Sequence, residues 1–179
     1  MAIAPPFNLT KWISEHRDLL KPPVGNKNIY TESGDYIVMV VAGPNARKDY
    51  HYNETEELFY QLEGHIQVHI QEDGQKKTMQ LGPGDMYLHP AKVPHSPERG
   101  ENSIGLVIER KRNHMNVDDG LLWFCDNCNH KLYEAYFTLN DIEKDFLAHF
   151  KYFYNSKELR NCDNCGTVMA VDKRFIAKE

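Results

Sequence analysis

The 179-residue sequence has no apolar run that approaches the roughly 18 to 20 residues of a membrane-spanning helix. Its first residues, MAIAPPFNLTKW, also lack the basic start and apolar stretch of a secretory signal. We therefore expect a protein that is neither embedded in a membrane nor exported. In the cytoplasm, its four cysteines would be reduced thiols.

An excess of positive charge is also missing, because 21 Lys and Arg residues stand against 26 Asp and Glu residues. The basic residues are scattered, and the short run from Arg110 to Arg112 is more typical of a solvated strand end than of a binding patch. The composition therefore argues against nucleic-acid binding. A hydrophobic content of 41% and an aromatic content of 11% are sufficient for a packed core.

Helical periodicity is confined to the two ends of the chain. Residues 8–20 carry apolar side chains at helical spacing, and so does the stretch around Phe146, Phe150 and Phe153. Between them lie short apolar or alternating runs bounded by Gly, Pro and Asn. These runs predict strands at 36–41, 58–62, 65–70, 76–81, 86–89 and 103–109. Such a pattern predicts an all-β fold, an antiparallel barrel or sandwich with a few peripheral helices.

The composition changes after residue 113. The polar stretch HMNVDDG is typical of a linker or long loop, and all four cysteines follow it. We therefore expect two parts, a barrel with its N-terminal helix in residues 1–113 and an extension in residues 114–179. The extension would hold a second, separate site.

Two histidines and one carboxylate predict a metal site in the barrel. His51 and Glu57 lie in the stretch GPNARKDYHYNETEELFYQLEG, and His95 follows in PAKVPHSPER. Such a set binds one face of an octahedral metal and leaves the opposite face open for a substrate and dioxygen. His65 and His69 occur on the polar face of a strand and are expected to have no metal role, and His89 is expected at most to line the barrel mouth.

The four cysteines form two identical tetrads. Cys125-Asp-Asn-Cys128 and Cys162-Asp-Asn-Cys165 each offer two thiolates from one turn, and together they predict a tetrahedral sulfur cage. Disulfides or a redox dithiol are the alternatives. Four thiolates suit both zinc and a rubredoxin-like iron, so the residues leave the metal open. A closed cage has no position for a substrate, which indicates a structural or iron-storing site.

The glycines and prolines around the three ligands resemble the two motifs of the cupin superfamily, small jelly-roll barrels with a metal inside. The first cupin motif usually contains His-x-His, whereas this chain has Asn53 at the second position. That departure predicts three protein ligands instead of four. Within the cupins, AGPNARKDYHYNETEELFYQLEG and PAKVPHSPER resemble the 3-hydroxyanthranilate 3,4-dioxygenase family. The resemblance extends to the TKW…LLKPPVGN segment and to the paired cysteines.

This resemblance implies Fe(II) held by His51, Glu57 and His95, and opening of the 3-hydroxyanthranilate ring by both atoms of dioxygen. The product would be 2-amino-3-carboxymuconate semialdehyde, which cyclises without an enzyme to quinolinate, a precursor of NAD. It also favours iron at the four cysteines, in a rubredoxin-like extension, and a homodimer.

Three further residues become candidates for substrate binding and catalysis beside Glu57. Arg99 would bind the substrate carboxylate through its planar guanidinium. The resemblance places Arg47 by the carboxylate or the oxygen site. Glu109 would accept a hydrogen bond from the amino or hydroxyl edge. Two other functions stay open, a non-catalytic metal-binding cupin with a zinc-knuckle module and a cupin isomerase that uses Zn(II) or Mn(II).

Overall fold

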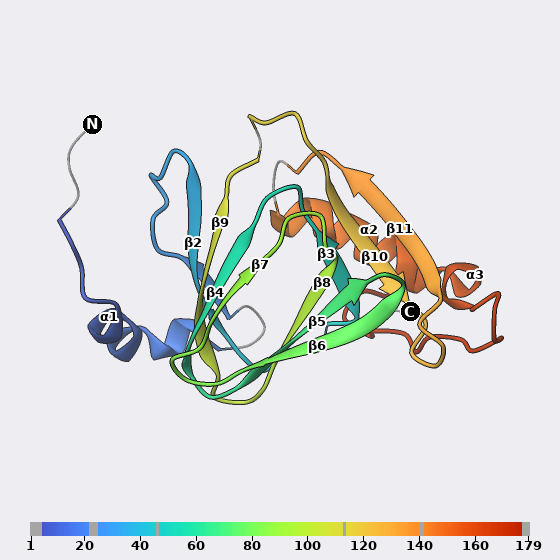
Figure 1. Ribbon diagram of the computed structural model, residues 1–179, viewed down its shortest axis with the longest axis horizontal. Helices are drawn as coiled ribbons and strands as arrows, with labels where there is room; N and C mark the ends of the chain where they lie inside the picture. The colour runs from blue at the N-terminus through green and yellow to red at the C-terminus, as the bar shows by residue number, and fades with distance from the viewer. Residues whose placement is uncertain (1–4, 22–24, 46, 113, 140–141, 177–179) are drawn as a thin grey trace.

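Two antiparallel sheets face each other in the computed structural model, which describes residues 5–21, 25–45, 47–112, 114–139 and 142–176 (Figure 1). The five-stranded sheet contains, in spatial order, β1 (Asn26–Asn28), β2 (Tyr36–Ala42), β9 (Ile104–Arg110), β4 (Glu57–Glu63) and β7 (Met86–His89). The six-stranded sheet contains β11 (Lys131–Phe137), β10 (Asp119–Phe124), β3 (Asp49–Tyr52), β8 (His95–Arg99), β5 (Ile66–Glu72) and β6 (Gln75–Leu81). This architecture confirms the expected all-β class, and the six predicted strands are present with ends that differ by at most two residues.

The main core lies between the two sheets. Phe59 and Val107 come from the five-stranded sheet, and Ile66, Val68 and Ile70 come from β5 of the other sheet. The predicted alternation along β5 is confirmed, because these three residues are almost fully buried while the polar residues between them face outward. Burial of alternate side chains fixes the register of the sheet, since a slip by one residue would expose the whole apolar set.

The N-terminal segment forms two short helices instead of the single predicted helix. Helix α1 (Leu9–Glu15) begins after Asn8, whose side chain accepts a hydrogen bond from the Lys11 backbone amide, and a 3-10 helix (Arg17–Leu19) follows. Ile13 and Leu20 pack with β2 and β9 of the five-stranded sheet. Figure 1 shows these helices at the opposite side of the molecule from the C-terminal helices.

The C-terminal segment joins the barrel through a strand that the sequence reading missed. After the polar stretch, β10 pairs with β3 on one side and with β11 on the other, so the six-stranded sheet continues into this segment. Helix α2 (Ile142–Asn155) packs on β10 through a cluster that includes Phe146, Phe153, Leu121 and Trp123. A short helix, α3 (Lys157–Arg160), follows.

The division between residues 1–113 and 114–179 therefore stays a prediction. Residue 113 itself lies outside the described part of the chain. In the described part, no helix combines the length and the apolar character that crossing a membrane requires.

Phe153 is the residue on which this C-terminal packing depends most. Its ring is fully buried and stacks on Trp123 with centroids 4.4 Å apart. Phe153→Ala should lower the free energy of unfolding by about 3–5 kcal/mol, because it leaves a cavity under β10. Tyr152→Ala is the matched control, since Tyr152 is 62% exposed. Chemical denaturation measures both, and equal losses in the two variants would contradict this packing.

Candidate metal centres

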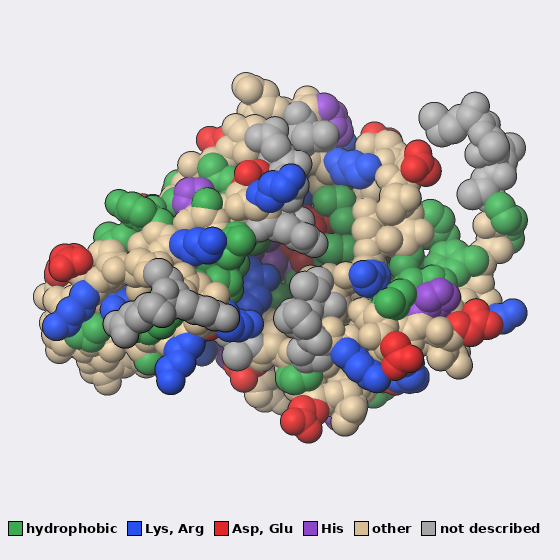
Figure 2. Space-filling view, turned by 180° about the vertical axis from the view of Figure 1, so that it is seen from behind, with side chains coloured by type: hydrophobic (Ala, Val, Ile, Leu, Met, Phe, Trp, Pro, Cys, Tyr) green, Lys and Arg blue, Asp and Glu red, His purple; other side chains and the backbone are tan. Residues whose placement is uncertain are grey.

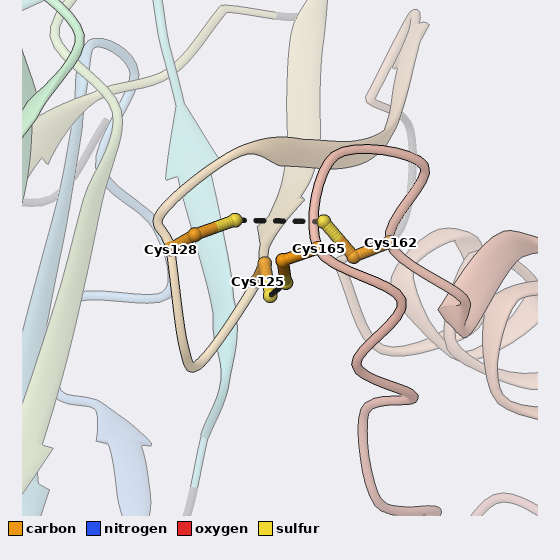
Figure 3. Close-up of side chains that lie close together, drawn as sticks. All are labelled: Cys125, Cys128, Cys162 and Cys165. Atoms are coloured by element: carbon orange, nitrogen blue, oxygen red, sulfur yellow. Dashed lines mark hydrogen bonds between the residues drawn. The ribbon is translucent and has the colours of Figure 1, made fainter.

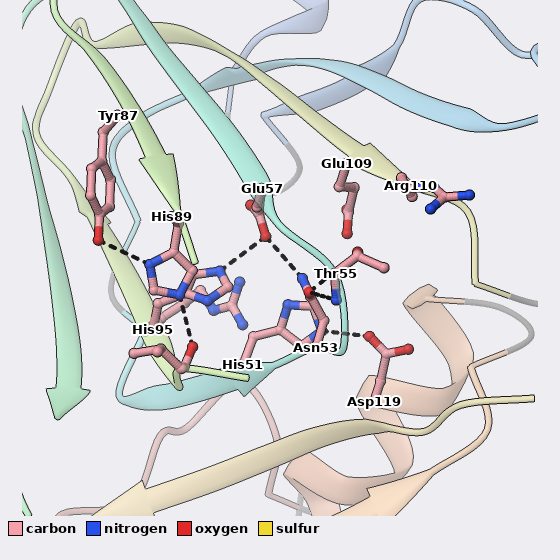
Figure 4. Close-up of polar contacts among 12 residues, drawn as sticks. His51, Asn53, Thr55, Glu57, Tyr87, His89, His95, Glu109, Arg110 and Asp119 are labelled. Carbon is pink, nitrogen blue, oxygen red and sulfur yellow. Dashed lines mark hydrogen bonds and ion pairs between the residues drawn. The ribbon is translucent and has the colours of Figure 1, made fainter. Parts of the chain in front are cut away.

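Strand pairing brings the three predicted barrel ligands together. His51 on β3 is the register partner of His95 on β8, and Glu57 projects from β4 of the facing sheet. The three residues are 2–6% exposed, and one donor atom from each lies within 4.8 Å of the others. Figure 4 shows them converging in the barrel interior.

The donor geometry fits a divalent metal. Glu57 Oε2 lies 3.1 Å from His95 Nε2, and two neighbouring ligands of an octahedral metal with bonds near 2.1 Å are about 3.0 Å apart. His51 Nε2 lies 2.7 Å from Asp119 Oδ1, which leaves the Nδ1 of His51 for a metal. Two imidazoles, one carboxylate and an open face suit iron, zinc or manganese.

Burial and neighbouring charges set the protonation states that metal binding requires. Burial lowers the pKa of His51, which favours the neutral imidazole. Burial alone would raise the pKa of Glu57, but the imidazoles of His95 and His51 outweigh it and lower this pKa to about 2. Glu57 is therefore a carboxylate at neutral pH, as a ligand must be.

Asn53 takes a supporting position beside the ligands. Its amide nitrogen donates to Glu57 Oε2 at 3.3 Å, and its carbonyl oxygen accepts from the Thr55 backbone amide at 2.9 Å. Asn53 thus contacts Glu57, one of the three predicted ligands. Within the described residues, the barrel cluster consists of His51, Glu57 and His95.

Two other histidines, His89 and His69, have contacts at both ring nitrogens. His89 is buried and does not belong to the barrel cluster of candidate ligands among the described residues. Its Nε2 donates to the Val93 carbonyl at 2.8 Å, so its Nδ1 accepts from the Tyr87 hydroxyl at 3.1 Å. His69 contacts Thr78 and Glu98 on the polar face of β5, as predicted.

The two candidate arginines differ in their surroundings. Arg99 is 3% exposed, and its Nη1 has no hydrogen-bond partner among the described residues. Burial lowers the pKa of Arg99 to about 10, partly offset by Glu57, so the guanidinium stays charged. Arg47 is 30% exposed and paired with Asp49. Arg99 therefore has unused donor capacity inside the barrel.

Glu109 faces the same interior as Glu57, because the two residues are register partners on β9 and β4. Burial, reinforced by the charge of Glu57, raises the pKa of Glu109 to about 7. Arg112 opposes this shift through a hydrogen bond from its Nη1 to Glu109 Oε2 at 2.6 Å. Two neighbouring buried carboxylates require cations nearby.

Arg112 and Asp119 are buried charged residues next to the predicted ligands that the sequence did not reveal. Arg112 is 4% exposed, so the expectation of a solvated run at residues 110–112 is wrong for this side chain. Its Nη2 and Nε donate to the two oxygens of Asp119 at 2.7 and 3.0 Å. Asp119 is fully buried and in turn contacts His51. No local pattern reveals this set, because Asp119 lies 68 residues beyond His51.

The four cysteines converge from two turns, as Figure 3 shows. Sγ of Cys125 lies 3.6 Å from Sγ of Cys165, and Sγ of Cys128 lies 3.5 Å from that of Cys162. A disulfide would require about 2.05 Å, whereas thiolates around one tetrahedral metal with bonds of 2.3 Å lie about 3.8 Å apart. The distances therefore fit a four-thiolate metal site.

The turn that carries Cys125 and Cys128 is bound to the barrel by hydrogen bonds and an ion pair. The amides of Asn129 and Gln71 exchange two hydrogen bonds, at 2.8 and 2.9 Å. Lys48, in the segment that leads into β3, contacts Asp126 at 2.6 Å. Cys125 itself follows directly after β10. The four-thiolate site is thus held against the sheet that carries His51 and His95.

Fold and sites together define a β-barrel protein with a candidate metal site of His51, Glu57 and His95 inside the barrel and a second candidate site at four clustered cysteines. A family model, "3-hydroxyanthranilic acid dioxygenase", matches residues 1–154. A 3-hydroxyanthranilate 3,4-dioxygenase of Xanthomonas campestris is 51% identical over 99% of both chains. One of Bacillus cereus is 46% identical over 91% of this chain and 90% of that protein. The chain belongs to the 3-hydroxyanthranilic acid dioxygenase family.

A solved cupin-2 domain protein of Shewanella frigidimarina is also similar, with 23% identity and a TM-score of 0.45. That similarity covers 59% of this chain and 94% of the other.

The separation of the two sites leads to a testable difference. Cys125→Ser should remove the metal of the four-cysteine site and lower thermal stability, because the cage then lacks one thiolate. The barrel ligands are untouched, so one equivalent of barrel metal should remain. Metal analysis and thermal unfolding measure both effects, and loss of the barrel metal from a folded Cys125→Ser protein would contradict independent sites.

Proposed function

We propose that the chain is an Fe(II)-dependent dioxygenase that opens the ring of 3-hydroxyanthranilate. Both oxygen atoms of O2 enter the product, 2-amino-3-carboxymuconate semialdehyde, so the reaction consumes no external reductant. This product cyclises to quinolinate without an enzyme, which connects the reaction to pyridine nucleotide synthesis from tryptophan. Family membership and relatives of that name over the full length support the proposal.

The single observation that carries it is a buried guanidinium beside an open metal site. Arg99 places in the barrel interior an Nη1 that has no partner in the described part of the chain, close enough to Glu57 for the charges to interact. A protein that only binds a metal has no need for such a group. An aromatic acid requires it, because its carboxylate must be paired when it leaves water.

His51, Glu57 and His95 would hold the metal, and three ligands leave room for the adjacent hydroxyl and amino groups of the substrate. Fe(II) would supply the electrons that triplet dioxygen needs to react with an aromatic ring. Figure 2 shows charged and histidine side chains between hydrophobic ones in a recess on one face of the molecule.

Three polar side chains, Arg99, Arg47 and Glu109, are proposed to position the ring. Arg99 binds the substrate carboxylate, and Arg47, fixed by Asp49, lies on the more exposed side. Glu109 accepts a hydrogen bond from the amino or hydroxyl edge, and its raised pKa of about 7 suits a group that takes up a proton from the hydroxyl. Apolar residues such as Phe59, whose ring lies against His95 with centroids 5.9 Å apart, limit access of water.

The remaining parts of the proposal concern the second metal, the location and the assembly. The four thiolates are proposed to hold iron in a rubredoxin-like manner. Reduced thiols support a cytoplasmic location.

Strand β7 is an edge strand of the five-stranded sheet, and its Met86 and Leu88 are 65% and 56% exposed. We assign this apolar edge to a homodimer.

Oxygen uptake tests the main proposal. Protein loaded anaerobically with Fe(II), mixed with 3-hydroxyanthranilate and air, should consume one O2 per substrate and form the absorbing semialdehyde. His51→Ala should lose barrel iron and all turnover, because it removes one of three ligands. Iron-loaded parent protein without oxygen uptake would overturn the proposal, and so would turnover by iron-free His51→Ala.

Arg99→Ala tests how the substrate is chosen. Loss of a hydrogen-bonded charge pair should raise the KM for 3-hydroxyanthranilate by about 10- to 100-fold. The variant should process 2-aminophenol, which has no carboxylate, as well as the parent does. Arg17→Ala is the matched control, because this arginine is 54% exposed and pairs with Glu63 outside the barrel. An unchanged KM in Arg99→Ala would contradict the carboxylate role.

A further inference from the structure

A chain of buried ionic contacts connects the metal ligand His51 to the substrate-side residue Glu109. From His51, the contacts lead to Asp119, from Asp119 to Arg112, and from Arg112 to Glu109, with donor–acceptor distances of 2.7, 2.7 and 2.6 Å. All four residues are at most 6% exposed. None of these contacts is a surface ion pair that solvent would screen.

Asp119 determines which nitrogen of the His51 ring is available to a metal. A carboxylate only accepts, so the Nε2 of His51 must carry the proton that it donates to Asp119 Oδ1. The Nδ1 of His51 is then unprotonated and available as a ligand. A charged acceptor also increases the electron density of the imidazole, and a partner of this kind fixes both tautomer and orientation. Figure 4 shows Asp119 beyond His51, outside the ligand cluster.

Arg112 in turn fixes Asp119. Its Nη2 and Nε donate to both carboxylate oxygens, a fork that holds the plane of the carboxylate. Its Nη1 is shared between Glu109 and the carbonyl of Arg110, at 2.6 and 2.9 Å. One guanidinium therefore sets the positions of two carboxylates, one behind the ligand His51 and one proposed to face the substrate.

We propose that Asp119 and Arg112 form a positioning pair for the barrel metal, in which Asp119 selects Nδ1 of His51 as the ligand atom and Arg112 holds Asp119 in place. The inference rests on the proposed metal site. It also gives the C-terminal segment a part in that site, because Asp119 begins β10. Phe146 of α2 contributes as well, with its ring against His51 at a centroid distance of 5.2 Å.

Asp119→Asn tests the pair while nearly preserving shape. The four-cysteine site is first filled with one equivalent of Zn(II), and Fe(II) binding to the barrel is then measured by anaerobic dialysis against a buffered Fe(II) series. We expect binding to be about 10- to 100-fold weaker, as for loss of other partners of metal-bound histidines. Excess Fe(II) should restore most of the turnover, which it would not do for a general folding defect.

Asp118→Asn is the matched control, because this neighbouring carboxylate is exposed and contacts Thr138 instead of the barrel. It should bind Fe(II) like the parent. Parent-like Fe(II) affinity in a folded Asp119→Asn protein would overturn the proposal.

If Asp119→Asn does not fold, Arg112→Lys decides the question. Lysine keeps the charge but cannot form the fork, so Fe(II) binding should be weaker than in Asp118→Asn, and parent-like affinity would overturn the proposal. Oxygen uptake by the parent protein distinguishes a failure of the proposed function from a failure of the positioning pair. If the parent binds Fe(II) without consuming oxygen, the proposed substrate is wrong, whereas the affinities still test the positioning pair.

Discussion

Two buried carboxylates on neighbouring strands set the constraint that the interior must satisfy. Glu57 and Glu109 are register partners across β4 and β9, so both project into the barrel. Taking one uncompensated carboxylate out of water costs several kcal/mol, and two side by side cost more. Arg112 pairs with Glu109 and also with the buried Asp119. A divalent metal between His51, Glu57 and His95 would compensate the charge of Glu57, so metal binding would contribute to the charge balance of the interior.

The same constraint explains why the barrel and the C-terminal segment are built together. Arg112 is placed by the end of β9 and by its contacts with Asp119, which begins β10. Strand β10 then continues through Trp123, packed under α2, to Cys125 of the four-thiolate site. One strand thus connects the support of His51 to the second metal site. The C-terminal segment therefore contacts the barrel site through Asp119, while each of the two sites has its own ligands.

The clustering of the candidate ligands could be predicted from sequence because each lies in a local pattern. His51, Glu57 and His95 occur between glycine- and proline-rich turns, and the cysteines come as two tetrads. The alternation in β5 likewise predicted its buried face. Arg112 and Asp119 could not be found in this way, because their burial depends on the pairing of β10 with β3. A charged run and a polar stretch look solvated until that distant pairing is known.

Anomalous X-ray diffraction at the iron edge, from crystals grown with Fe(II), tests the central claim most directly. Two peaks are expected, one within the four cysteines and one in the barrel about 2.0–2.2 Å from Nδ1 of His51, an oxygen of Glu57 and a nitrogen of His95. Soaking with 3-hydroxyanthranilate without oxygen should place its carboxylate against Arg99. Iron at the cysteines alone, with His51 and His95 unligated at saturating Fe(II), would contradict the account.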